Sequence, residues 1–186
     1  KLNVLHWHIS DDESYPLQSI KFPNLWNSAY STTNVYTVSQ VKQLINYAHY
    51  RGVVLYLEID TPGHSAAMCR QYNFLCSNTT TSTSGGDTCQ SPMNPSNNQT
   101  WTYLQDLLIE TMSLYPDYHL IHLGADEVNQ SCWLNNPSIN HYLQQHHYTT
   151  EDVYFHFINF TAELALNENF LPIQWIEVYQ HFQQNR

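Results

Sequence analysis

Short apolar runs recur four times along the chain, and polar or chain-breaking residues bound each of them. The runs cover residues 2–8, 53–59, 119–123 and 171–176. Apolar runs of this length between turn-forming residues are typical of strands buried inside a parallel sheet. The pattern therefore predicts four buried strands.

Apolar residues at helical spacing occupy the segments between these runs. The first stripe follows Thr37 and stops at Gly52, as expected of a glycine at a helix end. The second lies between residues 101 and 112, and the third follows Thr149-x-x-Asp152, which resembles a capping box. Their apolar members are Val41, Leu44, Ile45 and Ala48; Trp101, Leu104, Leu107, Leu108 and Met112; and Val153, Phe157, Phe160 and Leu164. Alternating strands and helices predict parallel pairing through right-handed crossovers, and so an α/β fold.

Polar side chains suited to chemistry follow every expected strand. The endings are His6-Trp7-His8-Ile9-Ser10-Asp11-Asp12, Glu58-Ile59-Asp60-Thr61-Pro62-Gly63-His64, Asp126-Glu127, and Trp175 with Glu177. Asp126-Glu127 alone could simply begin a helix, whose positive end favours acidic residues. Because parallel α/β folds bind ligands at the carboxyl ends of their strands, four such endings favour a functional site.

The segments after the strands are long, and the longest runs from about residue 65 to residue 100. Long loops in this position hold substrate in barrel enzymes. The Ser/Thr/Gly-rich stretch at 78–87 also fits a disordered, glycosylated insertion. We assign the middle of this loop to such an insertion and its two ends to the site.

Composition narrows the function classes. The chain has 186 residues, which suggests one domain, and a formal net charge of -10 with only six Lys plus Arg. That charge argues against nucleic acid and anionic membrane surfaces as partners. No apolar run approaches the roughly 20 residues of a membrane span. The 14% aromatic content suits stacking on flat apolar ligand faces.

Cysteines and glycosylation motifs point to a secretory route. There are 4 Cys, at positions 69, 76, 89 and 132, without zinc-site spacing, and three pairings are open to them. N-x-[ST] motifs begin at Asn78, Asn98, Asn129 and Asn159. These features together favour a secreted or lysosomal protein. Since the chain opens on a strand without Met, we expect an internal piece of a longer protein.

Two enzyme chemistries compete for the strand endings. A metal-dependent barrel hydrolase could draw its ligands from six residues: His6, His8, Asp11, Asp60, His64 and Glu127. No G-x-S-x-G turn or Gly-rich phosphate loop occurs. Carboxylates beside Trp175 favour a sugar, which offers hydroxyls and an apolar face and whose cleavage needs a protonated acid.

The blocks KLNVLHWHISDDESYPL, LEIDTPGHS, HLGADEVNQSCW and QWIEV resemble the signature blocks of family 20 β-N-acetylhexosaminidases, especially the eukaryotic lysosomal and secreted enzymes. The blocks occur in family order along the whole chain. The resemblance implies a partial (β/α)8 TIM barrel, roughly strands two to five. Residues 1–186 would then be part of a single catalytic domain, with N-terminal and C-terminal parts of the parent protein missing.

The resemblance also implies the reaction: hydrolysis of terminal non-reducing N-acetylglucosamine or N-acetylgalactosamine from glycans. Glu127 matches the general acid/base. Asp126 matches the residue that orients the 2-acetamido group, whose oxygen attacks the anomeric carbon. An oxazolinium intermediate and net retention follow, a recognised exception to the two-carboxylate scheme. A non-catalytic sugar-binding relative is the alternative, which loss of either acid would have favoured.

The remaining site residues are likewise implied by the resemblance. Asp11 and His64 match the pair that supports the acid, and Trp175 matches the wall of the acetamide pocket. Asp60 and His8 match further blocks and are expected at the substrate. The resemblance implies no cofactor and no metal, and a homodimer is the assembly we consider for the parent.

Two departures from the family pattern stand out. The family has Gly-Gly before Asp-Glu, whereas this chain has Gly124-Ala125, which would be strained if the position requires positive φ. The family's first-strand Arg falls before residue 1, and its later Tyr, Trp and acidic residues fall after residue 186.

The resemblance further implies the disulfides Cys76–Cys132 and Cys69–Cys89.

Overall fold

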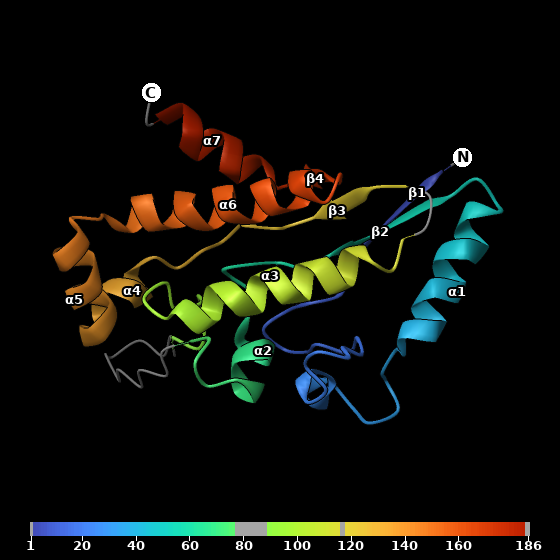
Figure 1. Ribbon diagram of the computed structural model, residues 1–186, viewed down its shortest axis with the longest axis horizontal. Helices are drawn as coiled ribbons and strands as arrows, with labels where there is room; N and C mark the ends of the chain where they lie inside the picture. Colours follow the sequence, from blue (N-terminus) through green and yellow to red (C-terminus); the bar gives the residue numbers. More distant parts are fainter. Residues whose placement is uncertain (1, 77–88, 116–117, 185–186) are drawn as a thin grey trace.

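The strands pair in parallel into one sheet in the order β1-β2-β3-β4 (Figure 1). They are β1 (Val4–His8), β2 (Val54–Glu58), β3 (Leu120–His122) and β4 (Leu171–Ile173). This computed structural model describes residues 2–76, 89–115 and 118–184. All four strands lie within the predicted runs, and the fold is α/β with the sheet forming an arc of a (β/α)8 barrel, as predicted.

Helices fill the connections, and three of them match the predicted stripes: α1 (Val38–His49), α3 (Asn98–Met112) and α6 (Thr150–Asn167). Thr37 and Thr149 form the capping boxes of α1 and α6, as the sequence indicates. The short elements η1 (Leu25–Ser28), α2 (Ala66–Gln71), α4 (Ser131–Asn135), α5 (Pro137–His146) and α7 (Ile176–Gln184) were not predicted. The last begins inside the fourth predicted strand, so β4 ends early. Within the described ranges, no helix combines the length and apolar character needed to cross a membrane.

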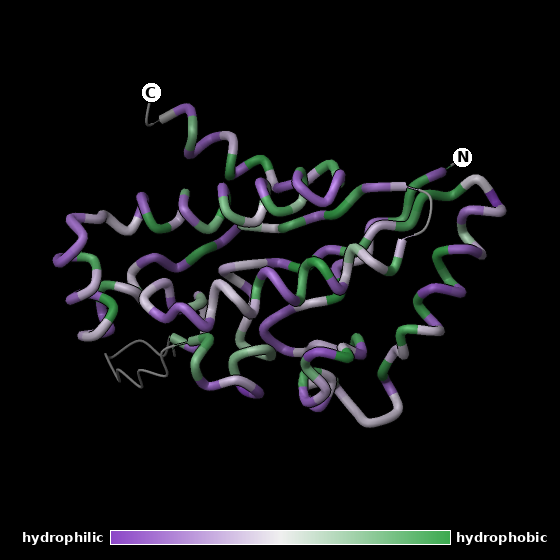
Figure 2. The backbone as a smooth tube through the Cα atoms, in the orientation of Figure 1, coloured by the Kyte–Doolittle hydropathy of each residue, from purple (hydrophilic) through white to green (hydrophobic). Residues whose placement is uncertain are grey.

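The two faces of the sheet differ in chemistry. Leu57 and Ile121 are fully buried and share the main core with Leu108 and Phe157, from α3 and α6. Those helices show alternating hydrophobic and hydrophilic segments in Figure 2 and meet through Trp101, whose ring centroid lies 4.4 Å from that of Phe157. The opposite face carries polar and aromatic side chains: His6, His8, Tyr56, Glu58 and His122. One face of the sheet therefore packs into the core, and the other carries the polar side chains that are candidates for a functional site.

The predicted disulfide pairing is wrong. The structure pairs Cys69 with Cys76 and Cys89 with Cys132, with a Cα–Cα distance of 5.5 Å in each bridge. Cys69 lies in the short helix α2, and the turn at Tyr72, whose carbonyl accepts from Leu75 N at 2.9 Å, brings Cys76 back beside it. Local chain reversal thus decides the pairing, which spacing alone left open.

The two ends of the long loop pair with each other and contact the segment that follows β2. Met93 pairs with Cys76 in an antiparallel bridge, and its N–H donates to Pro62 O at 3.0 Å. The buried indole of Trp133 donates to Met93 O at 2.9 Å. The loop therefore connects the segment after β2 to helix α4. The glycosylation motif at Asn78 lies outside the described residues.

Candidate functional site

Three predicted site residues meet beyond the carboxyl ends of β1, β2 and β3. Glu127 Oε2 lies 3.4 Å from His64 Nε2, and His64 Nδ1 lies 3.2 Å from Asp11 Oδ1. The Glu127 side chain is 70% exposed, whereas that of His64 is 23% exposed. The exposed Glu127 carboxylate thus contacts the His64 imidazole, and the Asp11 carboxylate orients that imidazole. This is a suitable geometry for a positioned proton donor and acceptor.

The backbone that presents Asp126 and Glu127 is unusual. Gly124, Ala125 and Glu127 have φ angles of +63°, +72° and +49°. Left-handed backbone is rare for residues other than glycine and clusters at functional sites. Ala125 therefore occupies the kind of position at which the sequence predicted strain. It is held by two hydrogen bonds: its N–H donates to Asp60 Oδ1 at 2.8 Å, and its carbonyl accepts from Tyr154 OH at 2.7 Å.

Asp60 and Asp126 form an acidic pair in which Asp126 is half-buried. Asp60 is fully buried, and atoms of Asp60, Asp126 and His64 lie within 4.8 Å of one another. Burial, followed by the nearby charge of Asp126, raises the pKa of Asp60 well above its ordinary range. The buried atoms Asp60 Oδ2 and Asp126 Oδ1 have no hydrogen-bond partner among the described residues. At neutral pH, Asp60 is therefore neutral.

Asp60→Asn should raise the thermal midpoint of the full-length protein above that of wild type. The difference between the two midpoints should grow from pH 5 to pH 8. Folded Asp60 keeps a proton that the unfolded side chain has released, so wild-type stability falls with rising pH until the raised pKa is reached. The fall is at most about 1.4 kcal/mol per pH unit. The Asn amide mimics the protonated carboxyl and does not titrate. Calorimetry at several pH values would measure the difference. Exposed Glu163→Gln is the control, and a difference for Asp60→Asn that stays constant with pH would contradict the assignment.

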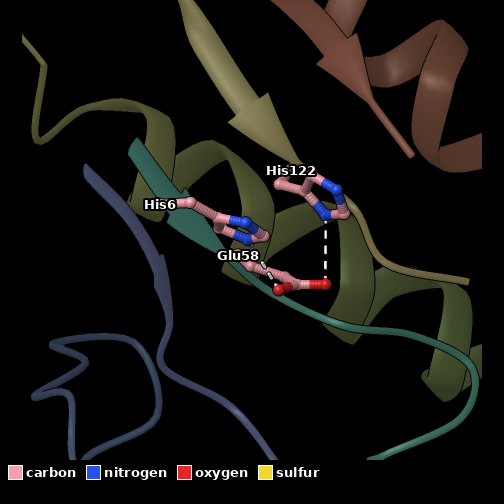
Figure 3. A group of neighbouring side chains, drawn as sticks. All are labelled: His6, Glu58 and His122. Carbon is pink, nitrogen blue, oxygen red and sulfur yellow. Dashed lines mark hydrogen bonds and ion pairs between the residues drawn. The ribbon is translucent and has the colours of Figure 1, made fainter. Parts of the chain in front are cut away.

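A second cluster lies on the open face of the sheet, around Glu58 (Figure 3). This fully buried carboxylate accepts from His6 Nε2 at 2.8 Å and His8 Nδ1 at 2.7 Å, and His122 Nδ1 lies 3.0 Å away. Burial would raise the pKa of Glu58, but the bonds from His122 and His8 outweigh it and hold the pKa well below its ordinary value. The bond to Glu58 raises the pKa of His8 above its ordinary value, although burial opposes this. Glu58 is therefore a buried anion.

The distances in this cluster are those of direct hydrogen bonds. His6, Glu58 and His122 could in principle hold a metal ion. Two ligands about 2.1 Å from one tetrahedral ion lie about 3.3 Å or more apart, whereas the N–O distances here are 2.8 Å and 3.0 Å. Nor does any such group among the described residues unite three of the six predicted metal ligands. The geometry thus favours a hydrogen-bonded network.

Trp175 joins the two clusters. Its backbone N–H donates to Gly124 O at 3.3 Å, and its indole Nε1 donates to Glu58 Oε1 at 2.8 Å. The ring centroid lies 4.9 Å from that of His122, and the residue is 39% exposed. Trp175 is thus partly exposed beside the acidic residues, and its role as the pocket wall stays a prediction. Glu58, His122 and Tyr154 were not predicted at the site; the available signal was a Glu ending an otherwise apolar run.

Three glycosylation motifs fall within described residues. Asn98 begins α3, Asn129 precedes α4, and Asn159 lies within α6; all three are exposed. Ser131 of the second motif donates to Asn129 Oδ1 at 2.6 Å. Modification at these positions stays a prediction.

Comparison with known proteins identifies relatives along the whole chain. Residues 1–186 match the model of the glycosyl hydrolase family 20 catalytic domain. Beta-hexosaminidase 1 of Arabidopsis thaliana is 35% identical over 182 residues, which are 98% of this chain and 32% of the relative. The beta-hexosaminidase subunit beta of Homo sapiens is 37% identical over 182 residues, 96% of this chain and 32% of the relative.

Solved structures agree with the fold. The chitobiase of Flavobacterium johnsoniae superimposes with a TM-score of 0.77 at 25% identity, covering 95% of this chain and 27% of that one. The chain spans about a third of the length of the curated relatives it matches. The family match over the whole chain and the identity to these relatives show that it belongs to glycosyl hydrolase family 20.

Proposed function

We propose that residues 1–186 are part of a single TIM-barrel catalytic domain of a β-N-acetylhexosaminidase. The enzyme removes terminal non-reducing N-acetylglucosamine or N-acetylgalactosamine from glycans with retention. The observation that carries the proposal is the row Glu127–His64–Asp11, with distances of 3.4 Å and 3.2 Å, beside the Asp60–Asp126 pair. The names of the relatives, beta-hexosaminidases, support the same activity.

In the first step, Glu127 donates its proton to the glycosidic oxygen as the bond to the leaving group breaks. A bound sugar would cover this exposed carboxyl and displace water from it. His64 fixes the position of the carboxyl, and Asp11 fixes the imidazole. Glu127 then acts as the base that takes a proton from the attacking water, since one group can serve both steps.

The acetamido group of the substrate supplies the nucleophile. Asp126, next to neutral Asp60, accepts the acetamido N–H. That bond pushes electron density onto the carbonyl oxygen, which attacks the anomeric carbon and forms the oxazolinium ring. Trp175 lies against the methyl group, and His8 and Asp60 complete the substrate contacts. Two inversions at the anomeric carbon give net retention.

The test is an assay of the full-length protein on an aryl N-acetyl-β-glucosaminide, with proton NMR of the first product formed. We expect the β-anomer before mutarotation. Binding of N-acetylglucosamine without turnover would favour the non-catalytic relative instead. First formation of the α-anomer would contradict the substrate-assisted mechanism.

Turnover should not respond to chelators. The hydrogen-bond distances around Glu58 support this expectation, because two ring N–H groups and an indole N–H already bond its oxygens. After dialysis against EDTA, we expect kcat/KM to stay within about twofold of the untreated enzyme. A loss of activity that zinc or another divalent ion restores would favour the metal-dependent hydrolase.

We also propose that the protein is lysosomal or secreted. Two disulfides and exposed Asn-x-Ser/Thr motifs support an oxidising compartment. A homodimeric parent stays a prediction, which sedimentation of the full-length protein would test.

A further inference from the structure

Trp175 is connected to Glu127 by an unbroken series of polar contacts. The members are, in order, Glu127, His64, Asp11, His8, Glu58 and Trp175. The contact from Asp11 to His8 measures 3.5 Å between Oδ2 and Nε2. The next two are shorter, at 2.7 Å from His8 Nδ1 to Glu58 and 2.8 Å from Trp175 Nε1 to Glu58. The series therefore spans both halves of the proposed site.

Glu58 is the one buried anion within this series. Its Oε2 accepts from His6 and His8, and its Oε1 accepts from Trp175 and faces His122. A carboxylate offers about four acceptor positions, and three N–H groups, of His6, His8 and Trp175, occupy three of them. Hydrogen bonds to an ionised acceptor are shorter and stronger than neutral ones. The orientation of the Trp175 indole is thus set by a charged acceptor that two histidines also hold in place.

We propose that Glu58 is a positioning residue: its carboxylate holds the Trp175 indole and the His8 imidazole together, so that the wall of the acetamide pocket and the acid–base row keep one mutual geometry. This inference rests on the proposed function and deepens it. In this role Glu58 acts on the substrate through Trp175 and His8.

The expected size of the effect follows from geometry. Trp175 is 39% exposed, so packing alone does not fix its ring. The acetamido oxygen must approach the anomeric carbon in line, and a misplacement of about 1 Å can cost about 100-fold in rate. Freed from Glu58, the indole would allow the acetamido group to tilt, and both ligand affinity and turnover would fall.

The experiment is a double-mutant cycle in the full-length enzyme with Glu58→Gln and Trp175→Phe. Gln offers one acceptor oxygen and one donor nitrogen, so it can serve Trp175 or the histidines but not both. Phe keeps an aromatic wall and removes the indole N–H. The readouts are kcat/KM and the inhibition constant of N-acetylglucosamine.

A matched control comes from the other face of the same strand. The Tyr115 OH accepts from Leu57 N at 2.7 Å, and Tyr115→Phe removes that buried bond without touching the site. We expect Tyr115→Phe to lower the thermal midpoint while kcat/KM stays within about twofold.

Each single variant should lower kcat/KM and weaken N-acetylglucosamine binding by at least about tenfold. The double variant should lose at least about fivefold less than the product of the single losses, because both changes break one connection. If the loss in the double variant equals the product of the two single losses, Glu58 and Trp175 act independently. Glu58 would then have only a structural role, and the inference would be overturned.

If Glu58→Gln fails to fold, Trp175→Phe decides alone. Unchanged affinity for N-acetylglucosamine in that variant, at an unchanged thermal midpoint, would equally overturn the inference. Wild-type enzyme is measured first. Wild type that neither binds nor cleaves the sugar refutes the proposed function itself, whereas an active wild type with multiplying losses refutes only the role of Glu58.

Discussion

Glu127→Gln in the full-length protein is expected to lower turnover of an aryl N-acetylglucosaminide by at least about 100-fold, the low end for general acid catalysis. The amide keeps the size of the carboxyl and its place 3.4 Å from His64 Nε2, but it has no proton to give to the leaving oxygen. Binding of N-acetylglucosamine should change little, because the Asp126 and Trp175 contacts remain.

The leaving group makes this test sharper. A dinitrophenyl group departs without protonation, so kcat/KM for that substrate should fall much less than for a poor leaving group. Glu163→Gln makes the same chemical change at an exposed position of α6 and serves as the control. Near-normal turnover of the poor leaving group by folded Glu127→Gln would remove Glu127 from the role of acid.

Gly124→Ala should be the most damaging of the small substitutions. The backbone φ at Gly124 is +63°, and an added Cβ would collide with the carboxyl group of Asp60. The left-handed backbone costs a residue with a Cβ about 1–2 kcal/mol, and overpacking a filled site adds about 1–3 kcal/mol. The collision also pushes Asp60 away from Ala125 N and from Asp126. We therefore expect a lower thermal midpoint together with loss of turnover.

Gly52 provides a matched control for this variant. Its φ is +68°, almost that of Gly124, but an added Cβ there has no neighbour within 4 Å. Gly52→Ala should therefore show the backbone cost alone and keep full activity. Calorimetry and turnover assays on both variants separate the cost of the left-handed backbone from the cost of the collision with Asp60. Equal destabilisation by the two substitutions would mean that the Asp60 side chain moves aside at no cost. The position of Asp60 beside Ala125 N and Asp126 would then not be fixed by the structure.

The order of strands and helices was predictable because local patterns decide it. Apolar runs marked all four strands, and Thr149 with Asp152 marked the start of α6, since capping needs only residues three apart. The gathering of Asp11, His64 and Glu127 was also predictable. The carboxyl ends of parallel strands meet at one edge whatever their separation along the chain.

The sequence by itself therefore determined the α/β architecture, its strand order and which segments supply the site. Only the tertiary structure decided which side chains touch. Cys69 pairs with Cys76 because a turn reverses the chain there, and any of three pairings suited the sequence. Glu58 on β2 meets ring nitrogens from its two neighbouring strands, β1 and β3, and the indole of Trp175, 117 residues further along the chain. Such contacts depend on strand register and on the direction of each side chain, which spacing along one chain does not specify.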